Sequence, residues 1–340
     1  MKKYLLIMSF LCISSAVRAQ IYGGSFESVL AAGKNDANVL MGAYVQPAME
    51  GLVYAMNGGW YHTAETHSKL GFDFTVAFNA SMVASEKEMF SISGLKFENT
   101  ITGVPDNTPT VAGGFDPSEV TVIINETNEQ VQFTMPEGIK DDLPLNAIPA
   151  PTLQASLGLI FDTDVIVRYT PKVGSNNVKG SIVGAGLKHN LMQYFGPLDK
   201  LPLHISVLGA FTKMNIDYDI EDGNVFEGAN QRAEFELNSY TVQAIASLDF
   251  PIISVYGALG YSGGKSNLKV LGTYKVSYAD VAGIPVREET FEDPIDLVYT
   301  PSGARATLGA RLNLSYFKIF ADYTVQDYNN ITAGIAFSFR

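Results

Sequence analysis

The chain has 340 residues, of which 46% are hydrophobic and 11% aromatic, and 23 basic against 35 acidic residues give it a formal net charge of −12. This acidic balance argues against nucleic acid as a partner, because the phosphate backbone attracts basic proteins. Cys12 is the only cysteine, so the chain beyond it has no disulfide framework and no cysteine-based metal or catalytic site.

The first 19 residues have the pattern of a secretory signal peptide. Three residues, MKK, form a basic start, residues 4–17 form an apolar run too short to span a bilayer, and Ala19 is a small residue at a suitable cleavage position. We therefore predict cleavage after Ala19 and export from the cytoplasm. The removed segment carries three basic residues and no acidic one, so the mature net charge is −15.

Residues 20–69 are predicted to form a short helical plug, or hatch. Apolar residues recur there at helical spacing, three and four positions apart: Met41, Tyr44, Val45, Ala48, Met49, Leu52, Val53 and Met56. Pro47 is expected to break the stretch or to begin a second helix at Ala48, and Asn57-Gly58-Gly59 to end it. A lid on a soluble β domain is the alternative. We favour a plug inside a barrel, because the apolar helix face needs a partner surface.

From Gly71 the sequence period becomes two, which is typical of strands with one apolar and one polar face. In 72–82, the phenylalanines at 72, 74 and 78 alternate with Asp73, Thr75 and Asn79. The alternation recurs in 153–161, 165–170, 203–212, 240–250, 304–315 and 330–339. Such segments are longer than a typical soluble strand and suit a tilted strand that crosses the apolar layer of a membrane.

The connections between these segments differ in length in a regular way. Tight turns are expected at Asp162-Thr163, Pro251 and Tyr316, whereas the two long polar excursions, 85–151 and 263–302, and a shorter loop at 215–232 lie on the other side. The exception is Met192 to Pro202, a longer connection on the side of the tight turns. Short periplasmic turns and long external loops are typical of outer-membrane barrels. The two longest excursions contain strand-like pieces, so each is expected to add up to one hairpin to about ten firmer strands.

We therefore predict an all-β fold: a transmembrane antiparallel β-barrel over residues 70–340, of about 14 strands within a range of about 10 to 14, with the short N-terminal helical plug. The lumen-facing set is then Asp73, Asn79, Arg168, His204, Gln243, Asp249, Arg305 and Arg311. A soluble secreted β protein is the alternative fold, and it would bury the apolar faces between sheets.

No motif predicts an enzyme, a cofactor or a metal site. The four histidines, His62, His67, His189 and His204, lack zinc-site spacing, and no G-x-S-x-G stretch occurs. What remains is transport, and flexible or amphipathic plug residues suit a loosely held apolar ligand. The candidate ligand-binding residues are Met41, Tyr44, Met49, Leu52, Tyr54, Met56 and Trp60. Alternatively, these side chains only pack the plug against the barrel wall.

Four features carry a resemblance to a known group. They are the helical segment before the barrel, the stretch 57–61 (NGGWY) leading to 70–74 (LGFDF), the stretch 183–188 (VGAGLK) and the terminal stretch 334–340 (GIAFSFR). The chain resembles the FadL/OmpP1-type outer-membrane transporter group and, more narrowly, an uncharacterised Bacteroidetes family distantly similar to it. The Asn-Pro-Ala stretch typical of the hatch is absent, so no binding residue is carried over from the group.

The resemblance implies a fourteen-stranded outer-membrane barrel with an N-terminal hatch, which takes up long-chain fatty acids or other hydrophobic small molecules by passive diffusion. Its partners would be outer-membrane lipid and the solute. The barrel-assembly machinery is a further expected partner, because it reads a terminal strand with an aromatic residue near its end, here Phe339. A role as a component or partner in protein secretion or surface attachment is the alternative function.

Overall fold

The computed structural model describes residues 29–102, 107–114, 116, 118–126, 128–174, 177–196, 201–220, 227–279 and 285–339. The predicted signal peptide and its cleavage site lie outside these residues.

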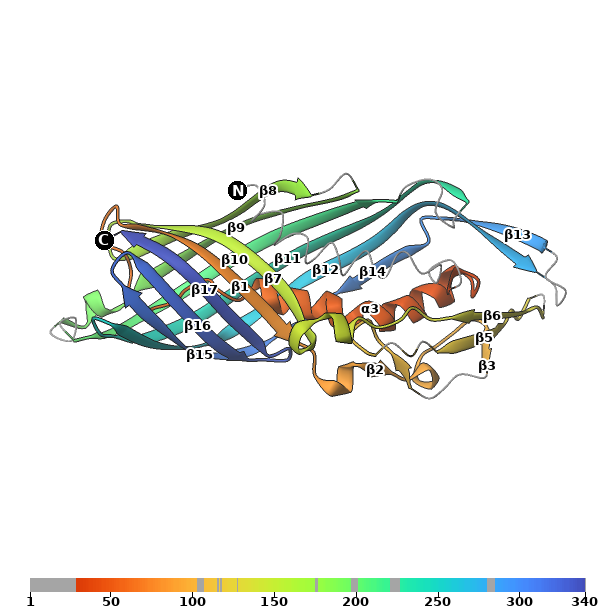
Figure 1. The fold of residues 1–340 in the computed structure, drawn as a ribbon, viewed down its shortest axis with the longest axis horizontal. Helices are drawn as coiled ribbons and strands as arrows, with labels where there is room; N and C mark the ends of the chain where they lie inside the picture. The colour runs from red at the N-terminus through yellow and green to blue at the C-terminus, as the bar shows by residue number, and fades with distance from the viewer. Residues whose placement is uncertain are drawn as a thin grey trace.

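Among the described residues, ten strands pair antiparallel, each with its neighbours in chain order, to form a closed ring (Figure 1). They are β1 (Phe72–Met82), β7 (Ala147–Gly158), β8 (Thr163–Gly174), β9 (Val178–Asn190), β10 (Leu203–Asp219), β11 (Gly228–Asp249), β12 (Ile253–Ala279), β15 (Ser302–Leu314), β16 (Phe317–Val325) and β17 (Asn330–Phe339). The first and last strands close the ring, from Phe72 opposite Phe339 to Ser81 opposite Asn330. The predicted antiparallel barrel is confirmed, with a ring at the lower bound of the expected strand number.

The barrel wall is polar inside and apolar outside. On β1, Thr75 and Asn79 are 2% and 0% exposed, whereas Phe74 and Phe78 are 59% and 49% exposed. The closed ring satisfies the backbone hydrogen bonds of its strands, which is the condition for crossing hydrocarbon. A wall of exposed apolar side chains is stable against lipid and costly in water. The soluble alternative requires the apolar faces to be packed between sheets, and in this structure they are not.

The two ends of the barrel differ. At what we call the turn end, residues 159–162, 250–252 and 315–316 make the three predicted tight connections. Aromatic rings gather there where the ring closes, with Phe337 and Tyr316 4.8 and 5.0 Å from Phe339 between ring centroids. Such a group suits the interfacial aromatic girdle of a membrane barrel. The opposite end, the loop end, carries the long excursions.

The excursion over residues 83–146, here called the cap, forms two small sheets outside the ring. One pairs β2 (Met89–Phe90) with β4 (Thr108–Pro109), and the other has the order β3 (Thr100–Thr102), β5 (Glu119–Ile123), β6 (Gln130–Thr134). Short 3-10 helices lie in the cap and after β9: Ser85–Lys87, Ile92–Gly94, Lys140–Asp142, Pro144–Asn146 and Met192–Tyr194. The cap strands therefore extend the molecule beyond the wall.

The second long excursion lengthens the wall on one side without adding strands to the ring. β12 has 27 residues, and its loop-end part pairs with β13 (Pro285–Glu292) and β14 (Ile295–Tyr299). The hairpins expected from the two excursions are thus present, but they lie beyond the ring. The physical reason is that β12 continues past the level where β15 pairs with it, and its exposed edge accepts the two short strands.

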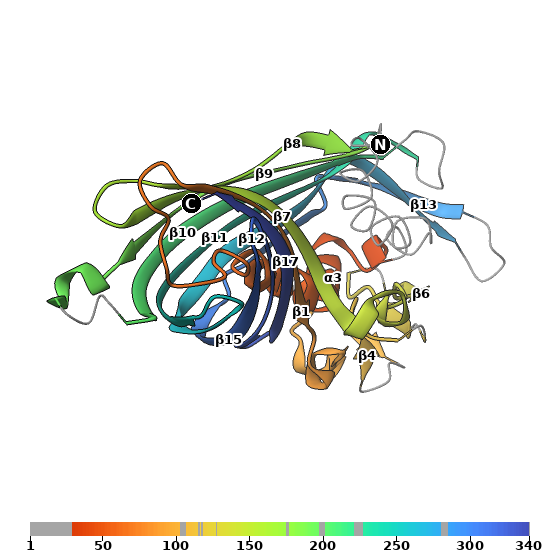
Figure 2. The same ribbon diagram turned by 60° about the vertical axis from the view of Figure 1, so that its left-hand side comes forward.

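The helix α3 (Lys34–Met56) runs from the loop end into the ring, and Figure 2 shows the segment between α3 and β1 passing inside it. The expected break at Pro47 is wrong: the helix continues through this buried residue. Packing against the cap and the wall on both sides outweighs the single lost backbone hydrogen bond. The predicted stop is confirmed, since Asn57 is the C-cap. No helix in the described part of the chain is long and apolar enough to cross a membrane.

Candidate functional site

The candidate site is the contact between the plug and the lumen wall. The described part of the plug comprises residues 29–69, and every residue from Asn57 to Ala64 is buried. The predicted inward-facing side chains do line this contact, and Arg168, Asn79 and Gln243 are at most 2% exposed. Residues 57–64 therefore lie within the lumen, whereas the first part of α3 packs against the cap and β12–β14 at the loop end.

Two arginines from different parts of the wall clamp the end of α3. Arg168 on β8 donates to the carbonyl oxygens of Met56 (2.8 Å) and Gly58 (2.6 Å). Arg305 on β15 donates to the carbonyl oxygen of Asn57 (2.9 Å). The last carbonyls of a helix have no partner within the helix and carry its negative dipole end. The two guanidinium groups therefore satisfy the carbonyls and balance the dipole at once.

Trp60 completes this clamp. The guanidinium of Arg168 lies 3.7 Å from the centroid of the Trp60 ring, a cation–π contact away from water. Gly184 and Gly186 on β9 leave space for the ring, since a Cβ at either position would lie only 3.3 or 3.2 Å from it. The glycine-rich part of β9 thus fits the one tryptophan of the chain.

Below Trp60, the plug meets the wall through ionic groups. His62 and His67 contact the carboxylate of Asp73 at 3.3 and 3.2 Å, and His67 also contacts Asp164 at 3.1 Å. His67 belongs to the plug and not to a spanning strand. Burial lowers the pKa of His67, but hydrogen bonds and charge attraction from Asp164 and Asp73 outweigh burial and raise that pKa to about 9. The His67 imidazolium therefore ties the plug to β1 and β8.

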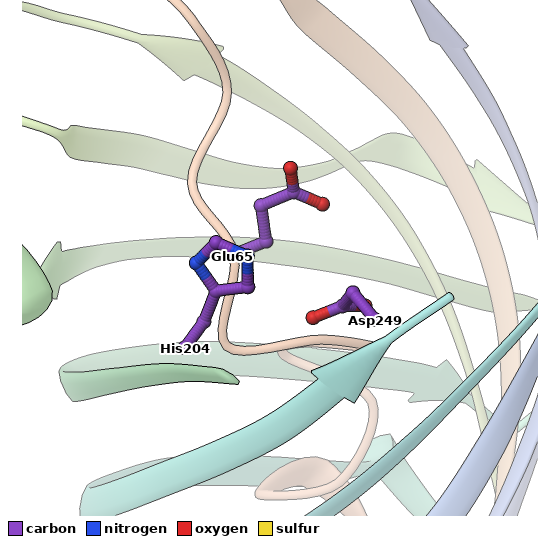
Figure 3. Close-up of side chains that lie close together, drawn as sticks. All are labelled: Glu65, His204 and Asp249. Carbon is purple, nitrogen blue, oxygen red and sulfur yellow. The ribbon is translucent and has the colours of Figure 1, made fainter. Parts of the chain in front are cut away.

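A second polar group lies nearby at the turn end. Asp249, at the end of β11, accepts hydrogen bonds from Thr63 (2.9 Å) and Arg311 (3.1 Å). Glu65 of the plug and His204 of β10 lie next to it, and Figure 3 shows the three side chains Glu65, His204 and Asp249 around one space. One ligand atom of each lies within 4.8 Å of the others. Spacing along the chain gave no signal for this group, because its members come from three distant segments.

The seven candidate ligand residues do not converge on one pocket. Met41, Tyr44 and Met49 are buried at the loop end in an apolar cluster of α3, the cap and β12–β14. Met56, with the half-buried Leu52, packs against the wall near Ile182 and Leu237. Tyr54 stacks on Tyr328 at 5.6 Å, and Trp60 belongs to the clamp. These contacts agree with the alternative that the residues pack the plug against its surroundings.

An apolar groove of about 660 Å³ lies on the outer wall and not in the lumen. Outward-facing residues of β10, β11, β12, β15 and β16 supply most of its lining: Ile205, Ala244, Ala246, Gly257, Leu259, Ala306, Leu308, Tyr323 and Val325. Its position on the exposed apolar face places it against lipid.

A family model described as a family of unknown function, DUF6588, matches residues 1–339. The chain belongs to DUF6588. No curated protein sequence matches this DUF6588 chain.

Solved structures with a distant likeness to the DUF6588 chain include three outer-membrane proteins. Ail of Yersinia pestis is 10% identical, with a TM-score of 0.27 over 80% of this chain and 100% of its own. The translocator domain of the autotransporter NalP of Neisseria meningitidis is 12% identical, with a TM-score of 0.27 over 81% and 90%. The toluene transporter TodX of Pseudomonas putida is 8% identical, with a TM-score of 0.16 over 86% and 99%. The assignment of the barrel fold rests on the strand pairing and not on these likenesses.

Proposed function

We propose that this DUF6588 protein is an outer-membrane channel for passive uptake of small hydrophobic, fatty-acid-like molecules, with the N-terminal plug as its gate. The observation that carries the proposal is that residues 57–64 lie inside the ring, where polar contacts with the wall surround one small apolar cluster that includes Trp60 and Tyr61. The proposal makes outer-membrane lipid, the solute and the barrel-assembly machinery its partners.

Polar contacts suit a gate because water can replace them when the plug moves. Tyr61 donates to the amide oxygen of Gln243 at 2.9 Å, and Lys188 donates to the carbonyl oxygen of Glu65 at 2.7 Å. Each such contact contributes about 1 kcal/mol net, since its groups are hydrated once they separate. An interface of interlocked apolar side chains would resist opening far more strongly.

The apolar cluster at the loop end supports a hydrophobic solute. Its helix side includes Met41 and Met49, whose unbranched side chains adapt to irregular ligands. Tyr44 lies in the same cluster with its hydroxyl bound to the carbonyl oxygen of Glu137 at 2.6 Å. A solute arriving from outside meets this cluster before the polar lumen, so the cluster is the proposed entry site.

A reversible covalent lock on the plug tests the gate. The hydroxyl oxygens of Thr63 and Ser247 lie 3.1 Å apart, so cysteines at these two positions are placed for a disulfide between plug and wall. The chain beyond Cys12 has no other cysteine. In liposomes, oxidation of the Thr63→Cys/Ser247→Cys protein should abolish entry of labelled fatty acid, and a reductant should restore it.

The two single variants, Thr63→Cys and Ser247→Cys, are the matched controls, since neither can form the lock. Their uptake should not respond to oxidation. If the double variant is shown to be cross-linked and still admits fatty acid at the unlocked rate, the plug is not the gate. If no variant exceeds protein-free liposomes, the hydrophobic solute is wrong.

A role in protein secretion or surface attachment is the second candidate, and the cap favours it. The sheet β3-β5-β6 stands beyond the ring, and its edge strand β6 exposes Gln130, Gln132 and Thr134. An exposed edge strand is a common docking place for an extended segment of another protein.

Charges on that edge test the second candidate. The pair Gln130→Lys and Thr134→Lys should release a secreted protein that intact cells retain at their surface, because lysines block strand addition. The same pair should leave fatty-acid entry unchanged. Retention that is equal with and without the two lysines would remove the case for the β6 edge.

A further inference from the structure

We propose that Glu65, His204 and Asp249 form a binding site for a divalent first-row transition metal, which fastens the plug to the barrel wall at the turn end. A metal at this position does not depend on which solute the barrel admits.

The three side chains come from three separate elements. Glu65 lies on the plug, His204 near the start of β10 and Asp249 at the end of β11 (Figure 3). Their ligand atoms lie within 4.8 Å of one another. Ligands about 2.1 Å from a tetrahedral zinc ion stand about 3.4 Å apart. The Glu65 side chain is 49% exposed, so rotation of this side chain can supply the remaining approach.

Two of the three groups have coordination capacity to spare. The carboxylate of Glu65 has one ionic neighbour, Arg311, at 3.9 Å. Nδ1 of His204 makes only a long contact, 3.5 Å, with the amide nitrogen of Asn190, whose oxygen accepts from the backbone N–H of Met192. A metal on Nε2 moves the imidazole proton to Nδ1, so binding requires this long contact to give way to an acceptor such as water.

Asp249 has a different role, because neighbours already orient its carboxylate. Thr63 and Ser247 donate to it, and Arg311 donates to one oxygen at 3.1 Å. Outer hydrogen bonds of this kind fix the direction of a metal-binding carboxylate. Asp249 is therefore the rigid ligand and Glu65 the adjustable one.

The charge balance leaves room for a cation. Two carboxylates face the single guanidinium of Arg311, which also contacts His62 at 3.1 Å. Lys188 is paired with Asp164 at 3.1 Å, and Lys318 of β16 interacts electrostatically with Glu65 and Arg311. Glu65, Asp249 and Arg311 by themselves carry one net negative charge, which is available to a cation bound directly between the two carboxylates.

The ligand types select the class of metal. One imidazole and two carboxylates form a mixed nitrogen and oxygen set, which suits zinc and its neighbours, whereas calcium and magnesium prefer oxygen ligands alone. Three protein ligands leave one tetrahedral position for water. A bound ion would join Glu65 of the plug to β10 and β11, so it would slow the release of the plug from the wall.

Zinc titration of the full-length protein in detergent tests the site. After removal of metal with a chelator, Zn²⁺ should bind with one-to-one stoichiometry in calorimetry and raise the Tm. Glu65→Gln, His204→Gln and Asp249→Asn should each weaken zinc binding at least tenfold and remove the Tm shift. His189→Gln is the matched control, because His189 lies at the same end but outside the group, 2.8 Å from the hydroxyl of Thr163.

Folding of each variant is checked by its heat-dependent migration on a gel, and His204→Asn replaces any His204→Gln protein that does not fold. Equal zinc affinity in the three ligand variants and in His189→Gln would overturn the proposal. So would a site that prefers Ca²⁺ to Zn²⁺. The assay contains no solute, so its result is independent of the uptake experiments.

Discussion

The two halves of the plug are held in different ways. At the loop end, Leu40, Tyr44 and Val45 of α3 are buried in an apolar cluster with side chains of the cap and of β12–β14. At the turn end, residues 57–69 are held by arginine and carboxylate groups of the wall, besides a smaller apolar cluster around Trp60 and Tyr61. The same chain therefore changes its mode of attachment close to where α3 ends.

The difference has a physical consequence. Apolar burial has no preferred direction and hardly depends on pH or salt, whereas hydrogen bonds and ion pairs depend on geometry and on protonation. The helix half is thus a fixed attachment. We call the lower half, residues 57–69, a latch: individual hydrogen bonds and ion pairs hold it, and a change of pH can weaken them. The following changes break one half at a time.

The largest effect is expected from Arg168→Ala. The substitution leaves the carbonyls of Met56 and Gly58 buried without donors and removes the cation from the Trp60 ring. Two unpaired buried carbonyls should lower the free energy of unfolding by about 4 kcal/mol. Urea titration in detergent measures this loss. Arg232→Ala is the control: Arg232 pairs with Glu234 at the surface, and its loss should leave the urea midpoint unchanged.

Leu40→Ala breaks the other half. Leu40 is fully buried in the loop-end cluster, and the cavity left by its side chain should cost about 3 kcal/mol. Because no charged group is removed, the loss should be equal at pH 6.5 and at pH 9.5. Leu259→Ala is the control, since this outward side chain is 69% exposed. A loss that grew with pH would contradict the division between the two halves.

The pH dependence of the latch follows from His67. Its pKa is raised to about 9 in the folded protein, so the protonated form is stabilised. This contribution is complete below the ordinary histidine pKa of about 6.5 and disappears as the pH rises through 9. The free energy of unfolding should fall by about 3 kcal/mol between pH 6 and pH 10, because one unit of pKa shift corresponds to about 1.4 kcal/mol.

Unfolding midpoints between pH 6 and pH 10 measure the effect. In His67→Gln the fall should be absent, whereas His189→Gln should keep it, because His189 is not paired with Asp73 or Asp164. An identical pH profile in wild type and His67→Gln would show that the latch does not depend on this imidazolium.

The sequence was most informative about the wall. Residues alternate because a strand has two faces, so the inward direction of Asp73, Arg168 and Arg305 followed from their apolar neighbours alone. The tight connections at 159–162, 250–252 and 315–316 followed from where the alternation stops. Both signals are local, so they can be read from the sequence without knowing which residues pack together in the fold.

The hydrogen-bond partners of those inward-facing side chains could not be predicted, because they come from segments far apart in the chain. Arg168 and Met56 are 112 positions apart, and nothing in the spacing of either segment predicts that they meet. The passage of α3 through Pro47 also depended on distant packing, by the cap and by β12. An arginine on an otherwise apolar strand did carry a usable signal, since a buried guanidinium requires acceptors from outside its own strand.

The smallest expected effect separates packing from ligand binding at a candidate residue. Tyr44→Phe removes the hydroxyl that donates to the carbonyl oxygen of Glu137 and keeps the ring. The free energy of unfolding should fall by about 1 kcal/mol. Tyr299→Phe, which loses a matched hydrogen bond to Gly42, should lose as much, and the lipid-facing Tyr169→Phe should lose nothing. Because the apolar ring remains, fatty-acid entry through Tyr44→Phe should equal wild type. A drop in entry without a drop in stability would instead assign the Tyr44 hydroxyl to binding of the solute.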